Sequence, residues 1–324
     1  MGRSIRSFFK GSTRAAGVVG ISLAPTAVAV AHLLPAAQGT TRLQACGVQA
    51  VGSVADQAEA LKSLVKSHGL TGHACVHTLE PGAYSLLQIE KPPVEGDELR
   101  QAARWRIKDL IEYPVTEAVV DVFEIPGLQS RGRSPAVYVA ASHRDELQRR
   151  AELIEAAGLK LQQINIAELA LRNVGALAAQ GSESIAVLHL EERRGQIAIL
   201  RESALYVARV MDSGLAQLQD VARAVGEDEI DTTAARMEAY DRIALEVQRT
   251  MDYYDSYFAQ PPVRRMLILP DGPAIEELAG YARSSLGLTV ETPSLSALLG
   301  GAEGDPISAD CLLAVAGALD EAAP

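Results

Sequence analysis

The chain has 324 residues and a formal net charge of −11, with 48% hydrophobic and 22% charged residues. This balance is that of a globular protein, so intrinsic disorder is excluded. The acidic charge argues against a nucleic-acid partner, because clustered Lys and Arg bind phosphate backbones. The length suits two lobes or one large α/β domain. Aromatic residues make up only 4%, and a core of Ala, Val, Leu and Ile favours strands covered by helices.

The first 14 residues depart from the acidic composition. They carry four basic residues, Arg3, Arg6, Lys10 and Arg14, with three large apolar residues between them and no acidic residue. One interpretation is a solvated chain terminus. The other is a peripheral contact with an anionic inner leaflet or with a membrane-bound partner.

The apolar stretch from Ala15 to Leu34 resembles a signal peptide in composition, and export is therefore one interpretation. Pro25 and His32 interrupt the stretch, however, and apolar residues alternate before Ala24. This pattern predicts a β-hairpin with its turn at Ala24 to Thr26. Three widely spaced cysteines fit neither a disulfide framework nor a zinc pattern, which favours a reducing compartment. We expect a cytoplasmic protein.

The rest of the first half alternates helices and strands. Lys91-Pro92-Pro93 breaks the chain, because each proline lacks an N–H group, and we place a subdomain boundary there. The patterns predict helices at 54–67, 95–111, 144–157 and 168–178, and strands at 73–79, 84–89, 119–125, 136–141 and 161–166.

The second half begins after Gly181 with three successive strands, which indicates a meander. The patterns predict strands at 184–190, 196–201, 204–211, 265–269 and 289–291, helices at 215–225, 234–258, 273–286 and 308–319, and an acidic loop at 226–231. Because each half opens with consecutive strands and continues with helices, we predict two related lobes.

Four stretches together resemble a known family: residues 99–114 (LRQAARWRIKDLIEYP), 120–123 (VDVF), 156–172 (AAGLKLQQINIAELALR) and 244–254 (ALEVQRTMDYY). They are similar to the PilM family of type IV pilus assembly proteins, most closely its MshI branch, which serves mannose-sensitive haemagglutinin (MSHA) pili. The resemblance implies an α/β, actin-like (ribonuclease H-like) two-lobed fold with an inserted small α/β subdomain.

The resemblance also implies a division of the chain. After a basic tail at 1–16, the first actin-like lobe spans 17–180 and contains the inserted subdomain at about 91–166. The second lobe spans 181–305. A C-terminal helix within 306–324 is expected to pack back on the first lobe.

Relatives of this family bind ATP between the lobes, with an Asp-x-Gly turn in each half and a glycine pair near the adenosine. By resemblance the corresponding positions are Ser22, Ala24, His189 and Gly272, and only Gly272 keeps the expected residue type. Glu191 replaces the second turn's glycine. Two negative charges about 4 Å apart repel by about 4 kcal/mol at an effective dielectric of about 20. We therefore expect no cofactor and no enzyme activity, with ATP and Mg²⁺ binding as the alternative.

His73, Cys75 and His77 alternate along one predicted strand and are ligand types for zinc. Residues four apart on a strand lie about 13 Å from each other, too far for one ion. We predict an ordinary strand and no metal site. The sequence contains no HExxH, GxSxG or Walker A motif, so nucleophilic catalysis has no candidate residue.

The resemblance implies a scaffold at the inner membrane that holds the cytoplasmic tail of a one-span pilus assembly protein and couples it to the assembly platform. We expect the tail to dock between the hairpin at 18–34 and the subdomain. The candidate partner-binding residues are Trp105, Arg104, Arg100, Val28 and Val30. Trp and Arg are enriched at binding hot spots, although Trp105 could instead pack in the core. The alternatives are an actin-like ATPase and a lobe of a type II secretion protein.

Overall fold

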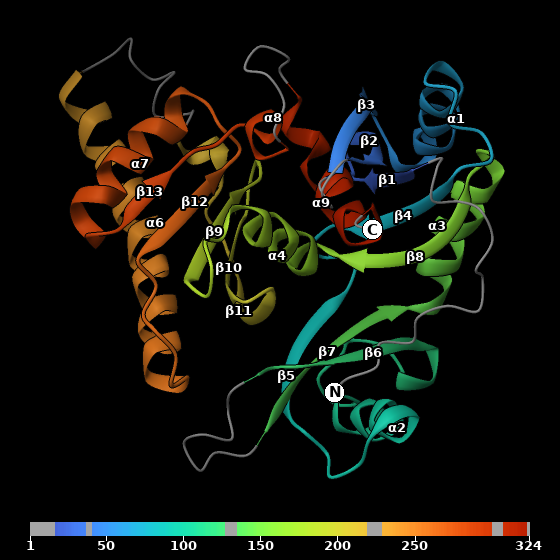
Figure 1. Ribbon diagram of the computed structural model, residues 1–324, viewed down its shortest axis with the longest axis horizontal. Helices are drawn as coiled ribbons and strands as arrows, with labels where there is room; N and C mark the ends of the chain where they lie inside the picture. Colours follow the sequence, from blue (N-terminus) through green and yellow to red (C-terminus); the bar gives the residue numbers. More distant parts are fainter. Residues whose placement is uncertain (1–16, 37–40, 127–134, 219–228, 300–306, 323–324) are drawn as a thin grey trace.

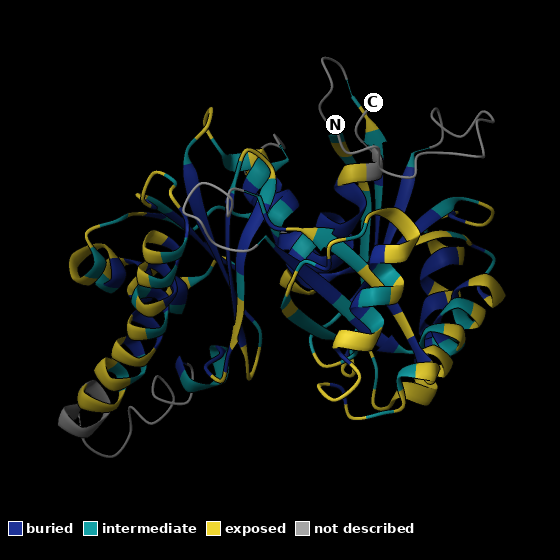
Figure 2. Cartoon of the chain, turned by 90° about the horizontal axis from the view of Figure 1, so that it is seen from below, coloured by how far each residue is buried: buried dark blue, intermediate teal, exposed yellow. Residues whose placement is uncertain are grey.

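The computed structural model describes residues 17–36, 41–126, 135–218, 229–299 and 307–322, with side chains at 229–233 and 321–322 excepted. Its described part forms two lobes, each built on a five-stranded sheet, and a subdomain built on a three-stranded sheet (Figure 1). Viewed from below, the sheets are largely buried and the outer faces of the helices are exposed (Figure 2).

The elements follow in chain order: β1 (Val18–Leu23), β2 (Ala27–Pro35), β3 (Thr41–Ala50), α1 (Gln57–Ser67), β4 (Ala74–Leu79), β5 (Ser85–Glu90), α2 (Gly96–Arg106), β6 (Ala118–Glu124), β7 (Ala136–His143), α3 (Arg144–Ala156), β8 (Lys160–Ile166), α4 (Ala167–Ala178), β9 (Ser184–Leu190), β10 (Gly195–Arg201), β11 (Ala204–Met211), α6 (Glu229–Tyr257), β12 (Arg265–Leu269), α7 (Pro273–Leu286), β13 (Thr289–Glu291), α8 (Leu295–Leu298) and α9 (Leu312–Ala322). Short 3₁₀ turns are η2 (Val54–Asp56), η3 (Val115–Glu117) and η5 (Ala309–Cys311).

The two large sheets have the same topology. The strand order is β3-β2-β1-β4-β8 in the first lobe and β11-β10-β9-β12-β13 in the second. In each sheet the first three strands of the lobe form an antiparallel meander, and two later strands run parallel to the first. The two lobes are therefore structural repeats, in agreement with the prediction from the order of elements.

Strand β3 was missed by the sequence prediction, which ended the hairpin at Leu34. The strand is rich in Gln, Arg, Ala and Gly, and these residues give no strong strand signal. Its hydrogen-bonded pairing with β2, from Ala27 opposite Ala50 to Pro35 opposite Thr41, fixes it in the sheet.

The subdomain has the sheet order β5-β7-β6, with α2 against one face. Val137 and Val139 point toward α2, and Tyr138 points to the opposite face. There the Tyr138 hydroxyl donates to the Tyr206 carbonyl over 3.3 Å and accepts from the Ala208 N–H over 3.2 Å. The subdomain is thereby fastened to β11 of the second lobe.

The subdomain boundaries differ from the prediction of about 91–166. β5 precedes Lys91 and pairs with β7, so it belongs to the subdomain. At the other end, β8 pairs with β4 of the first-lobe sheet, and Ile154 of α3 packs in the first-lobe core. The prolines after β5 end a strand of the subdomain and do not begin the subdomain. The inserted segment is therefore about 85–143.

The C-terminal helix α9 packs against β1, β2 and β4 of the first lobe and against α4. Gly20 of β1 permits this approach, because a Cβ there would lie 1.8 Å from the Ala314 carbonyl oxygen. The chain thus crosses to the second lobe after α4 and returns to the first lobe at its end.

In the second lobe, the predicted acidic loop is wrong from Glu229 onward, because α6 begins at that residue. The remainder of that loop, and the predicted helix beyond residue 218, lie outside the described residues. The basic tail also lies outside them. Among the described helices, none combines the length and the apolar character needed to cross a membrane.

Cys46 of β3 and Cys311 of η5 form a disulfide across 265 positions of sequence. The cysteine pattern predicted a reducing compartment, where disulfides are rare, and this pairing removes that pattern as support for such a compartment. The two cysteines meet only because α9 returns to the first lobe. Cys75 is a buried free thiol. Burial raises the pKa of the Cys75 thiol to about 12, with a smaller contribution from Glu155.

Candidate functional site: the cleft between the lobes

A cleft of about 1160 Å³ lies between the two lobes and extends to the subdomain. Its first-lobe wall is the turn between β1 and β2 together with the end of β4, and the segment from Leu110 to Tyr113 forms the subdomain wall. Its second-lobe wall is the turn between β9 and β10. The start of α9 also contributes, through Leu312 and Leu313. Every major part of the fold therefore meets at this cleft.

Ser22, Ala24 and His189, three of the four predicted nucleotide-turn positions, line the cleft. Gly272 is not among the lining residues, although Pro270 of the same turn is. Gly272 instead precedes α7, where its φ of 143° is a value that side chains rarely allow. Three of the four positions therefore lie at one cleft, and Gly272 lies outside its lining.

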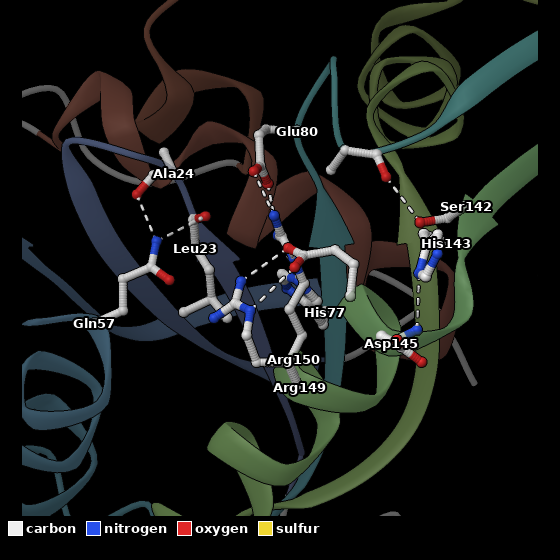
Figure 3. A network of polar contacts seen from close by, with 12 residues as sticks. Leu23, Ala24, Gln57, His77, Glu80, Ser142, His143, Asp145, Arg149 and Arg150 are labelled. Atoms are coloured by element: carbon white, nitrogen blue, oxygen red, sulfur yellow. Dashed lines mark hydrogen bonds and ion pairs between the residues drawn. The ribbon is translucent and has the colours of Figure 1, made fainter. Parts of the chain in front are cut away.

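Gln57 of α1 forms hydrogen bonds with the turn between β1 and β2. The Gln57 amide donates to the Leu23 carbonyl over 3.3 Å and to the Ala24 carbonyl over 3.0 Å (Figure 3). Pro25 lacks an N–H group, and so removes one donor from a loop that would otherwise present backbone N–H groups to an anion.

A buried ion network forms the first-lobe wall (Figure 3). Arg150 of α3 makes two parallel hydrogen bonds to Glu80, 2.6 and 2.8 Å long. Its Nε donates to Glu146 over 2.6 Å. Hydrogen bonds from Arg149, with those from Arg150, lower the pKa of Glu146 to about 2. The Arg150 guanidinium is thus surrounded by two carboxylates and is not available to a third anion.

His77 also belongs to this network, through its contact with Arg150. The Ile21 carbonyl can only accept, so the His77 Nδ1 carries the proton and donates over 3.2 Å, while Nε2 accepts from Arg150. Burial, with the charge of Arg150 as the next cause, lowers the pKa of His77 to about 3. His77 is therefore neutral, and it positions Arg150. The described residues contain no group of three or more potential metal ligands.

His189 is the second-last residue of β9 and lies at the second-lobe wall, where the resemblance expects a metal-positioning aspartate. It is 6% exposed, and its Nδ1 has no hydrogen-bond partner among the described residues. Burial lowers the pKa of His189 to about 4. A neutral imidazole at this place cannot act as the carboxylate that orients a metal and its water.

Carboxylates outnumber cations in the cleft. Glu80, Glu112, Glu146, Glu191, Glu192 and Asp310 line it, against Arg150, Arg193 and Arg194. Counted by formal charge, with histidine taken as zero, these lining groups leave a net charge of −3. Burial, then the charge of Glu80 across the cleft, raises the pKa of Glu191. A triphosphate here would face a surplus of carboxylates and would be repelled unless a cation offset them.

The five predicted partner-binding residues separate into two groups. Val28 and Val30 are at most 1% exposed and pack in the first-lobe core with α1, so the prediction that they contact a partner is wrong. Val28 and Val30 share one face of β2, and α1 and α3 cover that face. Trp105 is 66% exposed, which rules out its packing in the core.

Trp105, Arg104 and Arg100 lie on α2 and do not line the cleft, which begins at Leu110 on this side. Leu110 is itself 58% exposed. The subdomain therefore presents two different surfaces, a wall of the cleft at Leu110 to Tyr113 and the outer face of α2.

The chain matches no protein-family model and no curated protein sequence. Solved structures do match. A PilM–PilN type IV pilus biogenesis complex is 20% identical, with a TM-score of 0.68 over 96% of this chain and 100% of that chain. A Bacteroides thetaiotaomicron protein of unknown function, described as having an actin-like ATPase fold, is 8% identical, with a TM-score of 0.52 over 91% of this chain and 100% of that one.

The fold is actin-like. The actin-like fold expected from the sequence is thereby confirmed. The cytoplasmic domain of EpsL, from the type II secretion system of Vibrio cholerae, is 14% identical, with a TM-score of 0.44 over 83% of this chain and 95% of that chain. A likeness at that TM-score is too distant to support an argument.

Sequence reasoning missed the ion network of Glu80, Glu146 and Arg150. One signal was present, because Arg150 falls four residues before Ile154 and these are the two buried residues of α3. An arginine on the apolar face of a helix needs a buried acidic partner. Nothing in the local sequence pointed to Glu80 as that partner, since 70 positions separate the two residues.

Proposed function

We propose that the chain is a cytoplasmic scaffold for type IV pilus biogenesis, of the MSHA type, that holds the cytoplasmic tail of a one-span inner-membrane assembly protein. The likeness to the PilM–PilN complex supports the class of assembly. In this proposal the tail docks where the cleft meets the subdomain, and the scaffold works at the inner membrane and couples the tail to the assembly platform.

The observation that carries the proposal is the charge of the cleft. A net of three negative charges disfavours ATP, and it favours a basic peptide. Cytoplasmic segments next to a membrane span are rich in Lys and Arg. The tail of a one-span protein therefore has the charge that the cleft accommodates.

The docking groove lies between the β1–β2 turn and the subdomain. Ala24, Pro25 and Ala27 form one side, and Leu110 and Tyr113 form the other. Small and apolar residues on both sides suit an extended peptide, with apolar side chains of the peptide against Leu110. Glu112 lies in the same wall and can accept hydrogen bonds from basic side chains.

A labelled synthetic peptide that copies the cytoplasmic tail of a one-span pilus assembly protein tests the proposal by fluorescence anisotropy. We expect saturable binding that weakens as the salt concentration rises from about 0.05 to about 0.5 M, because salt screens the charges at the cleft mouth. A peptide of the same composition in scrambled order is the control. Equal binding of both peptides would contradict docking in a specific groove.

A further inference from the structure

The outer face of α2 carries the most exposed large apolar side chain among the described residues. Trp105 is 66% exposed and is the single tryptophan of the chain. The opposite face of α2 is buried against the subdomain sheet through Leu99 and Ala103, so Trp105 points away from the core. Packing therefore gives no reason for an indole at this position.

The same segment has the opposite charge to the chain as a whole. Arg100, Arg104, Arg106 and Lys108 fall within nine positions without an acidic residue between them, in a chain with a net charge of −11. Arg100 pairs with Asp97, and Lys108 lies 3.9 Å from Asp109. Arg104 and Arg106 have no carboxylate partner within the described residues. Both lie in the last turn of α2, where the helix dipole favours a cation, but that explains neither Lys108 nor the exposed indole.

We propose that this surface, made of Arg104, Trp105 and Arg106 at the end of α2 and of Lys108 just after it, binds an anionic phospholipid leaflet. An indole has an apolar ring and one N–H donor, and it settles at the level of the lipid headgroups. Each Lys or Arg side chain near the surface adds to the electrostatic attraction toward anionic lipids. A bilayer surface accepts an exposed indole such as that of Trp105 without a preformed pocket, whereas a protein partner would have to supply one.

The sequence supplies a second signal of the same chemistry, since residues 1–14 carry four basic and three large apolar residues. Weak membrane attachments become stable when two signals act together. The lipid-binding face does not depend on the scaffold proposal. The two are compatible, because Leu110 of the groove lies five positions beyond Trp105, and a tail leaving the membrane would emerge beside its groove.

The single tryptophan makes the test direct. The full chain is mixed with vesicles of phosphatidylcholine containing about 30% phosphatidylglycerol, and with vesicles of phosphatidylcholine alone. We expect a saturable blue shift of Trp105 fluorescence with the anionic vesicles only, and quenching when the lipid chains are brominated near the headgroup. Salt at about 0.5 M should reverse the shift. Unchanged Trp105 emission with anionic vesicles would overturn the proposal and leave an acidic protein as the partner of this face.

Charge reversal separates this face from general attraction. Arg106→Glu with Lys108→Glu should weaken vesicle cosedimentation at least about tenfold. The matched control is Arg242→Glu with Arg249→Glu, which makes the same change of net charge on the exposed side of α6. This control should lose less vesicle binding. Equal losses in both double variants would overturn the proposal. Circular dichroism shows whether each variant is folded.

A chain lacking residues 2–14 tests the contribution of the tail. We expect weaker binding but the same blue shift of Trp105 at saturation. If the deletion abolishes the shift even at saturating lipid, the tail alone binds the membrane and the assignment to α2 is overturned. Trp105→Ala, read by cosedimentation, should lose binding while Leu245→Ala, at a 50% exposed position of α6, should not.

Discussion

Arg150 and Glu80 form a buried bidentate ion pair at the wall of the cleft, with N–O distances of 2.6 and 2.8 Å. The side chains are 6% and 13% exposed. Removal of the guanidinium would leave Glu80 buried without a counter-charge. We therefore expect Arg150→Met to lower the free energy of unfolding by about 3 to 5 kcal/mol.

The matched control is Arg149→Met, because Arg149 bonds Glu146 on the same helix and its side chain is 39% exposed. Arg149→Met should lower the free energy of unfolding by less than about 1 kcal/mol. Urea denaturation of the two variants measures both values. Similar losses would show that the Arg150 pair adds nothing beyond a surface contact.

Two neutral buried histidines predict acid sensitivity. The pKa values of His77 and His189 are lowered in the folded chain to about 3 and about 4, whereas both groups titrate near about 6.5 when unfolded. Below that pH the unfolded chain binds protons that the folded chain does not, so stability falls with acidification. Each histidine should contribute a slope of about 1.4 kcal/mol per pH unit.

Denaturant titrations between about pH 5 and 6 follow this slope, and comparison with His189→Leu isolates it from Glu191, whose raised pKa acts in the opposite direction. His189→Leu should remove about half of the histidine contribution and leave that of His77. A slope that the substitution does not change would show that His189 is protonated in the folded chain or accessible to water.

The disulfide between Cys46 and Cys311 ties the start of α9 to the edge strand β3. Under oxidising conditions Cys46→Ser should lower the free energy of unfolding by about 2 to 4 kcal/mol, because the crosslink restricts the unfolded chain. In the presence of dithiothreitol the variant and the parent should be nearly equal. A thiol reagent should find no reactive group in the folded oxidised chain, since Cys75 is buried with a raised pKa.

Much of the fold could be predicted because its signals are local. Alternation in β1 and β2, the meander of β9 to β11, and the helical spacing of α7 are properties of short segments. The missing parts depend on contacts that are distant in sequence. β3 forms by pairing with the edge of β2. β5 belongs to the subdomain because it pairs with β7, and Val28 is buried because α1 covers its face of β2.

The candidate site was predicted in the same uneven way. Ser22 and His189 are each the second-last residue of a strand that the sequence predicts, and Ala24 follows β1, so all three reach the cleft. Gly272 does not, since its turn contributes Pro270 to the cleft instead. The sequence also could not show that Leu110 lines the cleft whereas Trp105 lies on the outer face of α2. The chain leaves the regular helix α2 at Arg106 and turns before Leu110.

The actin-like ATPase alternative makes an opposite prediction about nucleotide. Equilibrium titration with labelled ATP and Mg²⁺ should show no saturable binding at micromolar concentrations, because the cleft has a surplus of carboxylates and a neutral His189. Tight binding would favour the ATPase class. Nucleotide binding is compared in the presence and absence of Mg²⁺. Binding that requires Mg²⁺ would show that a cation offsets the carboxylates of the cleft.

The central claim is that the groove beside Leu110 holds the tail of a membrane-anchored partner, and one calorimetric comparison tests it most directly. Leu110→Asp places a charge on a 58% exposed side chain in the groove, and Leu245→Asp does so on a 50% exposed side chain of α6. We predict that Leu110→Asp weakens tail-peptide binding by at least about 2 kcal/mol, about 30-fold, while Leu245→Asp binds as the parent does. Equal affinity of the two folded variants would contradict the account.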